Sequence, residues 1–176
     1  RVTNVNKGIS YLIEACHKLA SDHPEMVAKI AIAMLGGHAE DLRKEFDFEV
    51  CELGYVNDTQ RIVDVYNASD VFVLPSLSEN LPNTIMEAMA CGVPCVGFKV
   101  GGIPEEIDHK ENGYVAKYCD AADLAQGLHW ILEEANYQEL SSSAIAKVKR
   151  SYSQRSVALQ YINIYNEAMA FKNYRL

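Results

Sequence analysis

Positive charge is scarce in this sequence. Its 176 residues contain 16 Lys and Arg against 24 Asp and Glu, which gives a net charge of −8 at pH 7. A protein with this balance is a poor partner for nucleic acid or for an anionic membrane surface, because both attract clustered cations. We therefore expect no nucleic-acid partner. Any phosphate that the protein binds must be held by a few well-placed cations and by backbone amides.

Several signatures of metal and covalent chemistry are also absent. The five cysteines are odd in number and include no Cys-x-x-Cys pair. This usage favours a reducing compartment over a disulfide framework, so we expect a cytoplasmic protein. The histidines form no cluster typical of metal ligands, and the Walker A, GxSxG, HExxH and GxGxxG motifs do not occur. No apolar run approaches the ~20 residues of a membrane span, and no signal peptide is visible.

What the sequence does contain is an alternation of short apolar runs with helical patterns. Apolar residues make up 49% of the chain and charged residues 23%, which is typical of a globular domain. We expect strands at residues 30–35, 48–53, 70–74, 93–97 and 113–117. We expect helices at residues 8–20, 39–45, 60–67, 84–91, 120–134, 137–150 and 153–171. This order predicts an α/β fold, a Rossmann-like parallel sheet flanked by helices on both faces.

The loops that follow the expected strands are the natural place for a site. In an open parallel sheet, ligands bind in the loops at the carboxyl ends of the strands. Here those loops are residues 36–38, 54–56, 76–83 and 100–104, and the last three are rich in glycine, proline and serine. We therefore expect the chemistry of the protein to lie there.

Two glutamates in this region, Glu79 and Glu87, are candidate site residues. Glu87 belongs to the expected helix at 84–91, whose other residues are almost all apolar, so we expect that helix to be buried. A carboxylate on a buried helix must be paired, protonated or turned into a polar cavity. From the residues alone, two readings stay open: a salt bridge to an Arg or Lys, or a cavity that offers hydroxyl donors such as those of a ribose.

Glu79 lies just ahead of the same helix, where the helix dipole stabilises a carboxylate by about 0.3–1 kcal/mol. That N-terminus, with the amides near Asn80 and Leu81, is also a ready site for a diphosphate. Two basic residues, Arg1 and Lys7, precede a glycine that opens the first expected helix. This placement suits phosphate binding, and the alternative is a solvated charge.

The chain also carries an ordered set of motifs from Arg1 to about residue 170. In order they are Arg1 with Lys7-Gly8, Gly36-Gly37, Gly54-Tyr55-Val56, SDVFVLPS at 69–76, Glu79-x7-Glu87, AMACGVP at 88–94 and GGIPE at 101–105. The set resembles the carboxyl-terminal domain of the group 1 glycosyltransferases, also called glycosyltransferase family 4, of the GT-B fold. A lone Glu-x7-Glu pair is a weak signal, whereas the ordered set is a strong one.

The resemblance implies roles for the charged residues that match it. Arg1 and Lys7 look like the basic pair that neutralises the diphosphate of the sugar donor. Glu79 looks like the glutamate that faces the transferred sugar. Glu87 looks like the glutamate that accepts hydrogen bonds from the donor ribose, which favours the cavity reading over the salt bridge.

The uncharged matches imply further donor contacts. Amides around Asn80 and Leu81 would contact the sugar or the phosphate. Tyr55 and Val56 lie where the family receives the nucleotide base. The sequence departs from a common family form after Glu79, because Asn80, Leu81 and a proline stand where many members have a glycine-rich stretch. This departure bears on the identity of the sugar.

The implied reaction is transfer of a hexose-type sugar from a nucleotide-diphosphate donor to an acceptor, with retention at the anomeric carbon. Fixed cations and a helix N-terminus would stabilise the negative charge of the leaving diphosphate, so the resemblance implies no metal and no other cofactor. Two alternatives are a non-catalytic module that binds nucleotide sugars and a nucleotide-sugar epimerase of related fold.

The resemblance also implies a second domain. We expect residues 1–176 to form the donor-binding half of a two-domain enzyme, with the helix at 153–171 in contact with an amino-terminal domain. Because the sequence begins at Arg1 and not at Met, we expect a fragment without that domain and without the family's preceding strand. Binding of a sugar or lipid-linked acceptor, and any association with the inner face of a membrane, would depend on the other domain.

Overall fold

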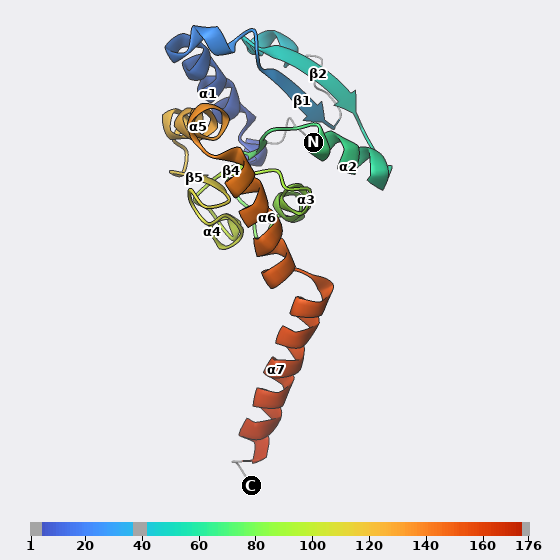
Figure 1. Cartoon of the computed structure of the whole chain (residues 1–176). Coiled ribbons are helices and arrows are strands. Elements are labelled where there is room, and N and C mark those ends of the chain that lie inside the picture. The colour runs from blue at the N-terminus through green and yellow to red at the C-terminus, as the bar shows by residue number, and fades with distance from the viewer. Residues whose placement is uncertain (1–4, 37–41, 174–176) are drawn as a thin grey trace.

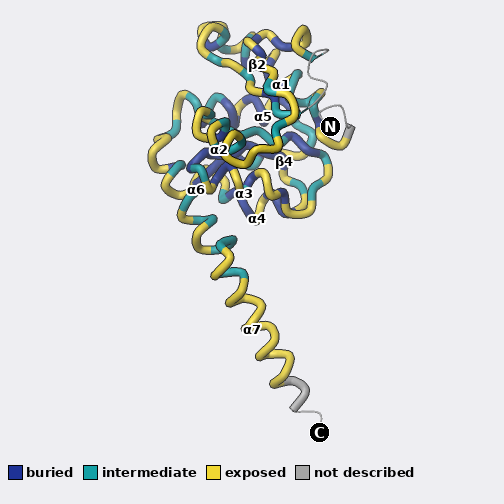
Figure 2. The backbone as a smooth tube through the Cα atoms, turned by 90° about the vertical axis from the view of Figure 1, so that its right-hand side faces the viewer, coloured by how far each residue is buried: buried dark blue, intermediate teal, exposed yellow. Residues whose placement is uncertain are grey.

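The structure, a computed structural model, describes residues 5–36 and 42–173. A body of strands and helices carries one long helix that projects from it, α7 (Gln154–Asn173) (Figures 1 and 2). The strands are β1 (Ala31–Leu35), β2 (Glu49–Gly54), β3 (Phe72–Leu74), β4 (Cys95–Phe98) and β5 (Gly113–Ala116). The other helices are α1 (Ile9–Asp22), α2 (Thr59–Asn67), α3 (Asn83–Ala90), α4 (Ile103–Glu106), α5 (Ala121–His129) and α6 (Tyr137–Ser151).

The five expected strands are all present, and side-chain caps explain where several helices begin. The carboxylates of Asp58 and Asp120 accept hydrogen bonds from amides in the first turns of α2 and α5. The expected helix at 120–134 ends as an α-helix at His129 and continues as a π-helical turn, Trp130–Glu134. Of the expected helix at 39–45, the described part contains a single turn, Arg43–Glu45, and residues 39–41 lie outside the described residues.

Every strand pair in the described residues is parallel, as expected, but the strands form two sheets. β1 pairs with β2, and β3 pairs with β4, which pairs with β5. β1 and β3 therefore each have one edge with no strand partner among the described residues. The chain that leads into α1 runs beside the end of β3, where the amide of Leu77 donates to the carbonyl of Asn6 at 2.8 Å.

Helices cover both faces of the three-stranded sheet. On β4, the buried side chains of Val96 and Phe98 belong to one hydrophobic cluster, and Cys95 belongs to the other. The first cluster lies toward α1 and α5 and includes Leu19 and Leu124. The second lies toward α3 and α6, because it includes Ile85, Met89 and Ala144. This alternation along β4 confirms the doubly covered sheet, since successive strand residues point to opposite faces.

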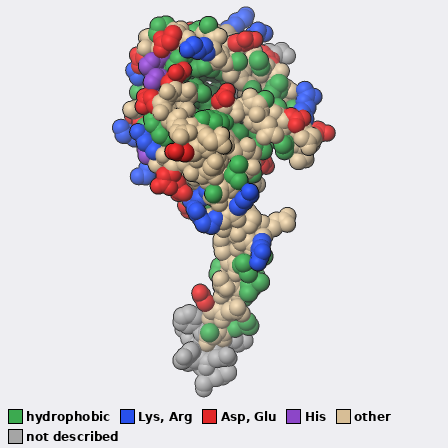
Figure 3. All heavy atoms as spheres, in the orientation of Figure 1, with side chains coloured by type: hydrophobic (Ala, Val, Ile, Leu, Met, Phe, Trp, Pro, Cys, Tyr) green, Lys and Arg blue, Asp and Glu red, His purple; other side chains and the backbone are tan. Residues whose placement is uncertain are grey.

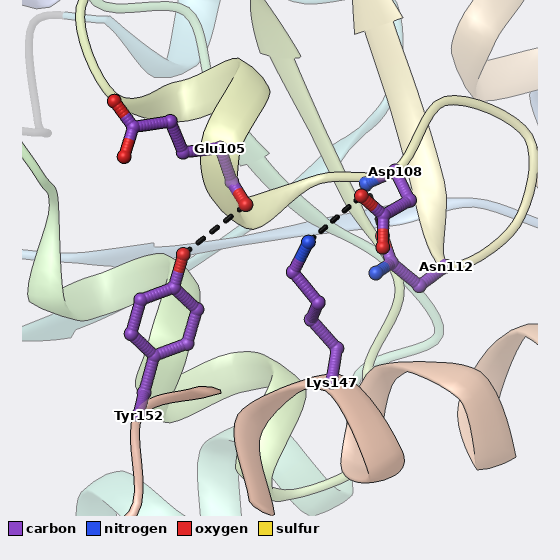
Figure 4. A network of polar contacts seen from close by, with 5 residues as sticks. All are labelled: Glu105, Asp108, Asn112, Lys147 and Tyr152. Atoms are coloured by element: carbon purple, nitrogen blue, oxygen red, sulfur yellow. Dashed lines mark hydrogen bonds and ion pairs between the residues drawn. The ribbon is translucent and has the colours of Figure 1, made fainter. Parts of the chain in front are cut away.

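Polar contacts fix α6 against the α4 segment (Figure 4). The Lys147 ammonium lies 2.8 Å from Asp108 Oδ1, and the Tyr152 hydroxyl donates to the carbonyl of Glu105 at 3.1 Å. Beyond α6, residues 158–170 of α7 are all exposed, with hydrophobic side chains on the surface of the helix (Figure 3). The contact of this helix with another domain stays a prediction. None of the described helices is both long and apolar enough to cross a membrane.

One carboxyl group lies inside the core. Ile103 and Glu106 form the buried face of α4, Ile107 directly after it is also buried, and Glu106 is 0% exposed. Its two carboxyl oxygens have no hydrogen-bond partner among the described residues. Burial, and after it the charges of Glu105 and Glu79, raise the pKa of Glu106 to about 8. The native state therefore holds this group mainly as the neutral acid at pH 7.

We expect Glu106→Gln to remove a pH dependence of stability. Between a pKa near 4.3 in the unfolded chain and one of about 8 in the native state, the native state binds more protons, so stability falls as pH rises. The free energy of unfolding should drop by up to about 1.4 kcal/mol per pH unit across this window, and the variant should lack that slope. Urea unfolding from pH 5 to pH 8 measures it.

The matched control is Glu133→Gln, which changes an exposed glutamate and should keep the slope of the unmodified chain. Equal slopes in the unmodified chain and the Glu106 variant would contradict the assignment.

Candidate functional site

The structure brings Lys7 and Glu79 together, although 72 positions separate them in the sequence. Lys7 ends the turn before α1, and Glu79 lies in the loop after β3. The Lys7 ammonium is 2.6 Å from Glu79 Oε1. Because all the strands are parallel, this pair lies at the carboxyl edge of the sheet, where the sequence predicted a site. Arg1, the other predicted cation, lies outside the described residues.

The Glu79 carboxylate is well held. Its side chain is 15% exposed and that of Lys7 is 46% exposed. Burial by itself would raise the pKa of Glu79, but the hydrogen bond from Lys7, the nearby Ser76 hydroxyl and the positive charge of Lys7 bring the pKa below its usual value. The Ser76 hydroxyl is fully buried, and no group among the described residues meets the distance and angle of a hydrogen bond to it. Glu79 is therefore ionised at neutral pH and carries negative charge beside a cation.

A glycine places Lys7 at this edge. Gly8 has a φ of 62°, and a Cβ atom there would lie 1.9 Å from the carbonyl oxygen of Pro75. No other residue fits this approach without moving the chain. The sequence interpretation linked this glycine to phosphate binding. In the structure it brings the start of α1 against the end of β3, and its link to phosphate binding stays a prediction.

The backbone amides of Asn80 and Leu81 point away from the turn formed by Gly101 and Gly102. Cβ atoms at Gly101 and Gly102 would lie 1.8 Å from the carbonyl oxygen of Glu79 and 2.3 Å from that of Asn80, so both carbonyls face this turn. In a trans peptide the C=O and the next N–H point in opposite directions, and the described chain has no cis peptide. The two amides therefore face outward, and among the described residues they have no hydrogen-bond partner.

These amides adjoin the N-terminus of α3. The helix begins at Asn83, after Pro82, and no side chain caps it. Its first amides therefore lack the intrahelical partners that later residues have. Together with the amides of Asn80 and Leu81 they form a group of donors near a fixed cation, an arrangement suited to an anion with several oxygens.

The predicted burial of the helix at 84–91 holds for one face, with Ile85, Ala88 and Met89, and is wrong for the face that carries Glu87. Asn83, Thr84, Glu87 and Ala90 are exposed, because they recur at helical spacing and form one face of α3. Glu87 has no Arg or Lys partner among the described residues. The salt-bridge reading therefore finds no support there. Among the described residues, the Glu87 side chain has one hydrogen bond, which the hydroxyl of Tyr66 donates to Glu87 Oε2 at 3.3 Å.

The Tyr66 hydroxyl stays a donor to Glu87 at neutral pH. Burial, and after it the charge of Glu87, raise the pKa of Tyr66 well above its usual value. The sequence analysis missed this tyrosine and also Ser76. Ser76 lies three residues before Glu79 at a strand end, which is a usable signal. Tyr66 lies 21 residues before Glu87, and no sequence pattern links the two.

Tyr55 and Val56 stand apart from the other predicted residues. They follow Gly54, which ends β2 with a φ of 65°. Tyr55 is 80% exposed and Val56 is half-buried. No described hydrogen bond or ion pair links either residue to Lys7 or Glu79. They share the carboxyl edge of the parallel strands but belong to the other sheet.

Within the described residues, no three His, Cys, Asp or Glu side chains are grouped so that they could hold a metal ion.

Comparison with known proteins identifies the family. The family model of the group 1 glycosyl transferases matches residues 1–134. An uncharacterized glycosyltransferase, MJ1607 of Methanocaldococcus jannaschii, is 35% identical in an alignment 170 residues long that covers 93% of this chain and 42% of that protein. A D-inositol 3-phosphate glycosyltransferase of Saccharomonospora viridis is 29% identical in an alignment 176 residues long that covers 93% of this chain and 41% of that protein. The chain thus spans less than half the length of these relatives.

Solved structures agree on the fold. The carboxyl-terminal domain of a group 1 glycosyl transferase, LpcC of Francisella tularensis, has a TM-score of 0.70 at 22% identity and covers 86% of this chain and 82% of that chain. Anabaena Alr3699/HepE, solved in complex with UDP, has a TM-score of 0.75 at 22% identity and covers 93% of this chain and 46% of that chain. The α/β architecture is that of one half of a GT-B enzyme. The chain belongs to the group 1 glycosyl transferases, and it is a carboxyl-terminal domain of that family.

Proposed function

We propose that this chain is the donor-binding domain of a retaining glycosyltransferase of the hexosyltransferase type. It would hold a nucleotide-diphosphate sugar for transfer to a sugar or lipid-linked acceptor. The observation that carries the proposal is the Lys7–Glu79 ion pair beside the outward amides of Asn80 and Leu81. In support, Anabaena Alr3699/HepE was solved in complex with UDP-glucose, and a pneumococcal O-GlcNAc transferase was solved with UDP and GlcNAc.

The proposed chemistry is electrostatic. When the bond between the sugar and the diphosphate breaks, negative charge builds up on the departing phosphate oxygens. Once the donor is bound, Lys7, Arg1 and the free amides at the start of α3 would already face these oxygens and would stabilise the charge without further rearrangement, which is the condition under which such groups accelerate a reaction most. These groups supply the positive charge themselves, so we propose that transfer needs no metal ion. Turnover in the presence of EDTA tests this point.

Glu79 would act as the catalytic residue that faces the transferred sugar. In the unliganded chain its carboxylate holds Lys7 at 2.6 Å. A bound diphosphate would draw the ammonium toward its own oxygens and free Glu79 to accept hydrogen bonds from sugar hydroxyls. Glu87, exposed on α3 and oriented by Tyr66, would accept from the ribose. Tyr55 and Val56, at the end of β2, would contact the base.

The direct test is calorimetric titration of the chain with UDP, GDP and ADP, and then with the matching nucleotide sugars. We expect preferential binding of one diphosphate and no transfer by this chain alone. The longer protein, assayed with acceptor, should release nucleotide diphosphate and form a product whose anomeric configuration matches that of the donor, as NMR would show. Conversion of the donor without acceptor would indicate an epimerase, and binding without turnover would indicate a binding module.

We expect Lys7→Ala to weaken binding of the preferred nucleoside diphosphate by about 1.5–3 kcal/mol, the usual contribution of a hydrogen bond to a charged group. The pKa of Glu79 should rise in this variant, because the substitution removes the cation that lowers it. Calorimetry measures the affinity, and NMR titration of the Glu79 carboxyl measures the pKa. Lys18→Ala is the control, since Lys18 pairs with Asp22 within α1. Unchanged affinity in the Lys7 variant would refute its role.

We expect Glu87→Gln to reduce the preference of the chain for a ribonucleotide over the matching 2′-deoxyribonucleotide. A carboxylate accepts from two ribose hydroxyls, whereas an amide offers one acceptor oxygen. The unmodified chain should bind the ribonucleotide more tightly than the 2′-deoxyribonucleotide by about 10-fold, the effect of one charged hydrogen bond, and the variant should bind the two within about 3-fold. Competition titrations measure both ratios. The control is Glu139→Gln, on the exposed face of α6, which should keep the affinity ratio of the unmodified chain. If the Glu87 variant also keeps that ratio, Glu87 does not contact the ribose.

A further inference from the structure

The loop that carries Glu79 is anchored at both of its ends. At Leu77, the backbone amide donates to the carbonyl of Asn6 at 2.8 Å, and the backbone carbonyl accepts from the hydroxyl of Tyr118 at 3.1 Å. At Asn80, the carbonyl accepts from the amide of Gly102. Only Ser78 and Glu79 lie between the two anchors. The backbone freedom of Glu79 is therefore limited by contacts that its own neighbours make.

Tyr118 is itself held in place. It follows β5, and its ring packs edge-on against the fully buried Phe98, with centroids 6.4 Å apart. Phe98 packs in the same way against Tyr11 of α1 at 5.6 Å. A tyrosine hydroxyl has an ordinary pKa near 10, so that of Tyr118 stays protonated at neutral pH and can donate to Leu77.

These contacts link three parts of the chain at one point. Asn6 immediately precedes Lys7, Leu77 lies two residues before Glu79, and Tyr118 belongs to the connection between β5 and α5. Leu77 is thus held on one side by the segment that carries the cation and on the other by the end of β5. Only Ser78 and Glu79 lie between Leu77 and the anchor at Asn80. A shift of Leu77 therefore moves Glu79 and changes its distance from Lys7.

We propose that Tyr118 is a positioning residue of the donor site, which holds the Leu77 carbonyl so that Glu79 meets Lys7 and faces the diphosphate sugar. This proposal rests on the proposed function for its ligand. It assigns to Tyr118 no contact with the donor. The hydroxyl acts only through the backbone of the loop, and the ring keeps the hydroxyl in place by packing on Phe98.

The test is Tyr118→Phe, which keeps the ring and removes the hydroxyl. Tyr152→Phe is the matched control, because the Tyr152 hydroxyl donates to the carbonyl of Glu105 at the same distance of 3.1 Å (Figure 4). Both variants lose one hydrogen bond from a tyrosine to a backbone carbonyl, so both should lose similar global stability. They differ in which segment the lost bond held.

The first readout is hydrogen–deuterium exchange of the Leu77 amide, which donates to the carbonyl of Asn6; this readout needs no ligand. We expect Tyr118→Phe to speed its exchange by about 2- to 10-fold, the factor for loss of one neutral hydrogen bond. Tyr152→Phe should leave this amide unchanged and speed exchange around residues 105–109. The second readout is the affinity for UDP, GDP and ADP, which should fall by a similar factor in the Tyr118 variant alone.

Each result has a definite meaning. Faster exchange of the Leu77 amide with weaker nucleotide binding, confined to Tyr118→Phe, supports the proposal. Unchanged exchange, or faster exchange with unchanged affinity, overturns it. If the unmodified chain binds no nucleotide at all, the proposed function fails for this chain, and the exchange comparison alone then decides whether Tyr118 holds the loop.

Discussion

The close approach of two backbone segments governs the arrangement of this site. The carbonyls of Glu79 and Asn80 face Gly101 and Gly102 at distances that leave no room for a Cβ atom. Because the peptide group is rigid and trans, this contact also decides where the following amides point. The glycines thus shape the candidate site without adding a side chain to it. They turn two amides toward the carboxyl edge of the sheet, where the Lys7 ammonium supplies the positive charge that an acidic protein has in short supply.

Two carboxyl groups near this turn differ in protonation, and the difference comes from their partners. Glu79 and Glu106 are both removed from solvent, which raises the pKa of each. Glu79 has a cation and a hydroxyl beside it, and its net pKa lies below the usual value. Glu106 has neither, and its pKa is about 8. The same fold therefore keeps one acid charged at the site and another neutral in the core.

The order of strands and helices could be predicted from the sequence because short apolar runs and helical spacing are local signals. The location of the site followed from the same reading, since parallel strands place their carboxyl ends together. The exposure of Glu87 was predicted wrongly because the apolar residues of α3 were counted without regard to their angular positions. The contacts of Lys7 with Glu79 and of Tyr118 with Leu77 span 72 and 41 positions, and only the folded chain reveals them.

The division of the strands into two sheets leaves unpaired strand edges, which bear on aggregation. Among the described residues, β1 and β3 each present an edge of backbone donors and acceptors without a strand partner. Such edges are templates on which other extended chains can pair, and the residues of β1 are all apolar. A segment packed on those edges would therefore lower the tendency of this domain to aggregate, whatever else that segment does.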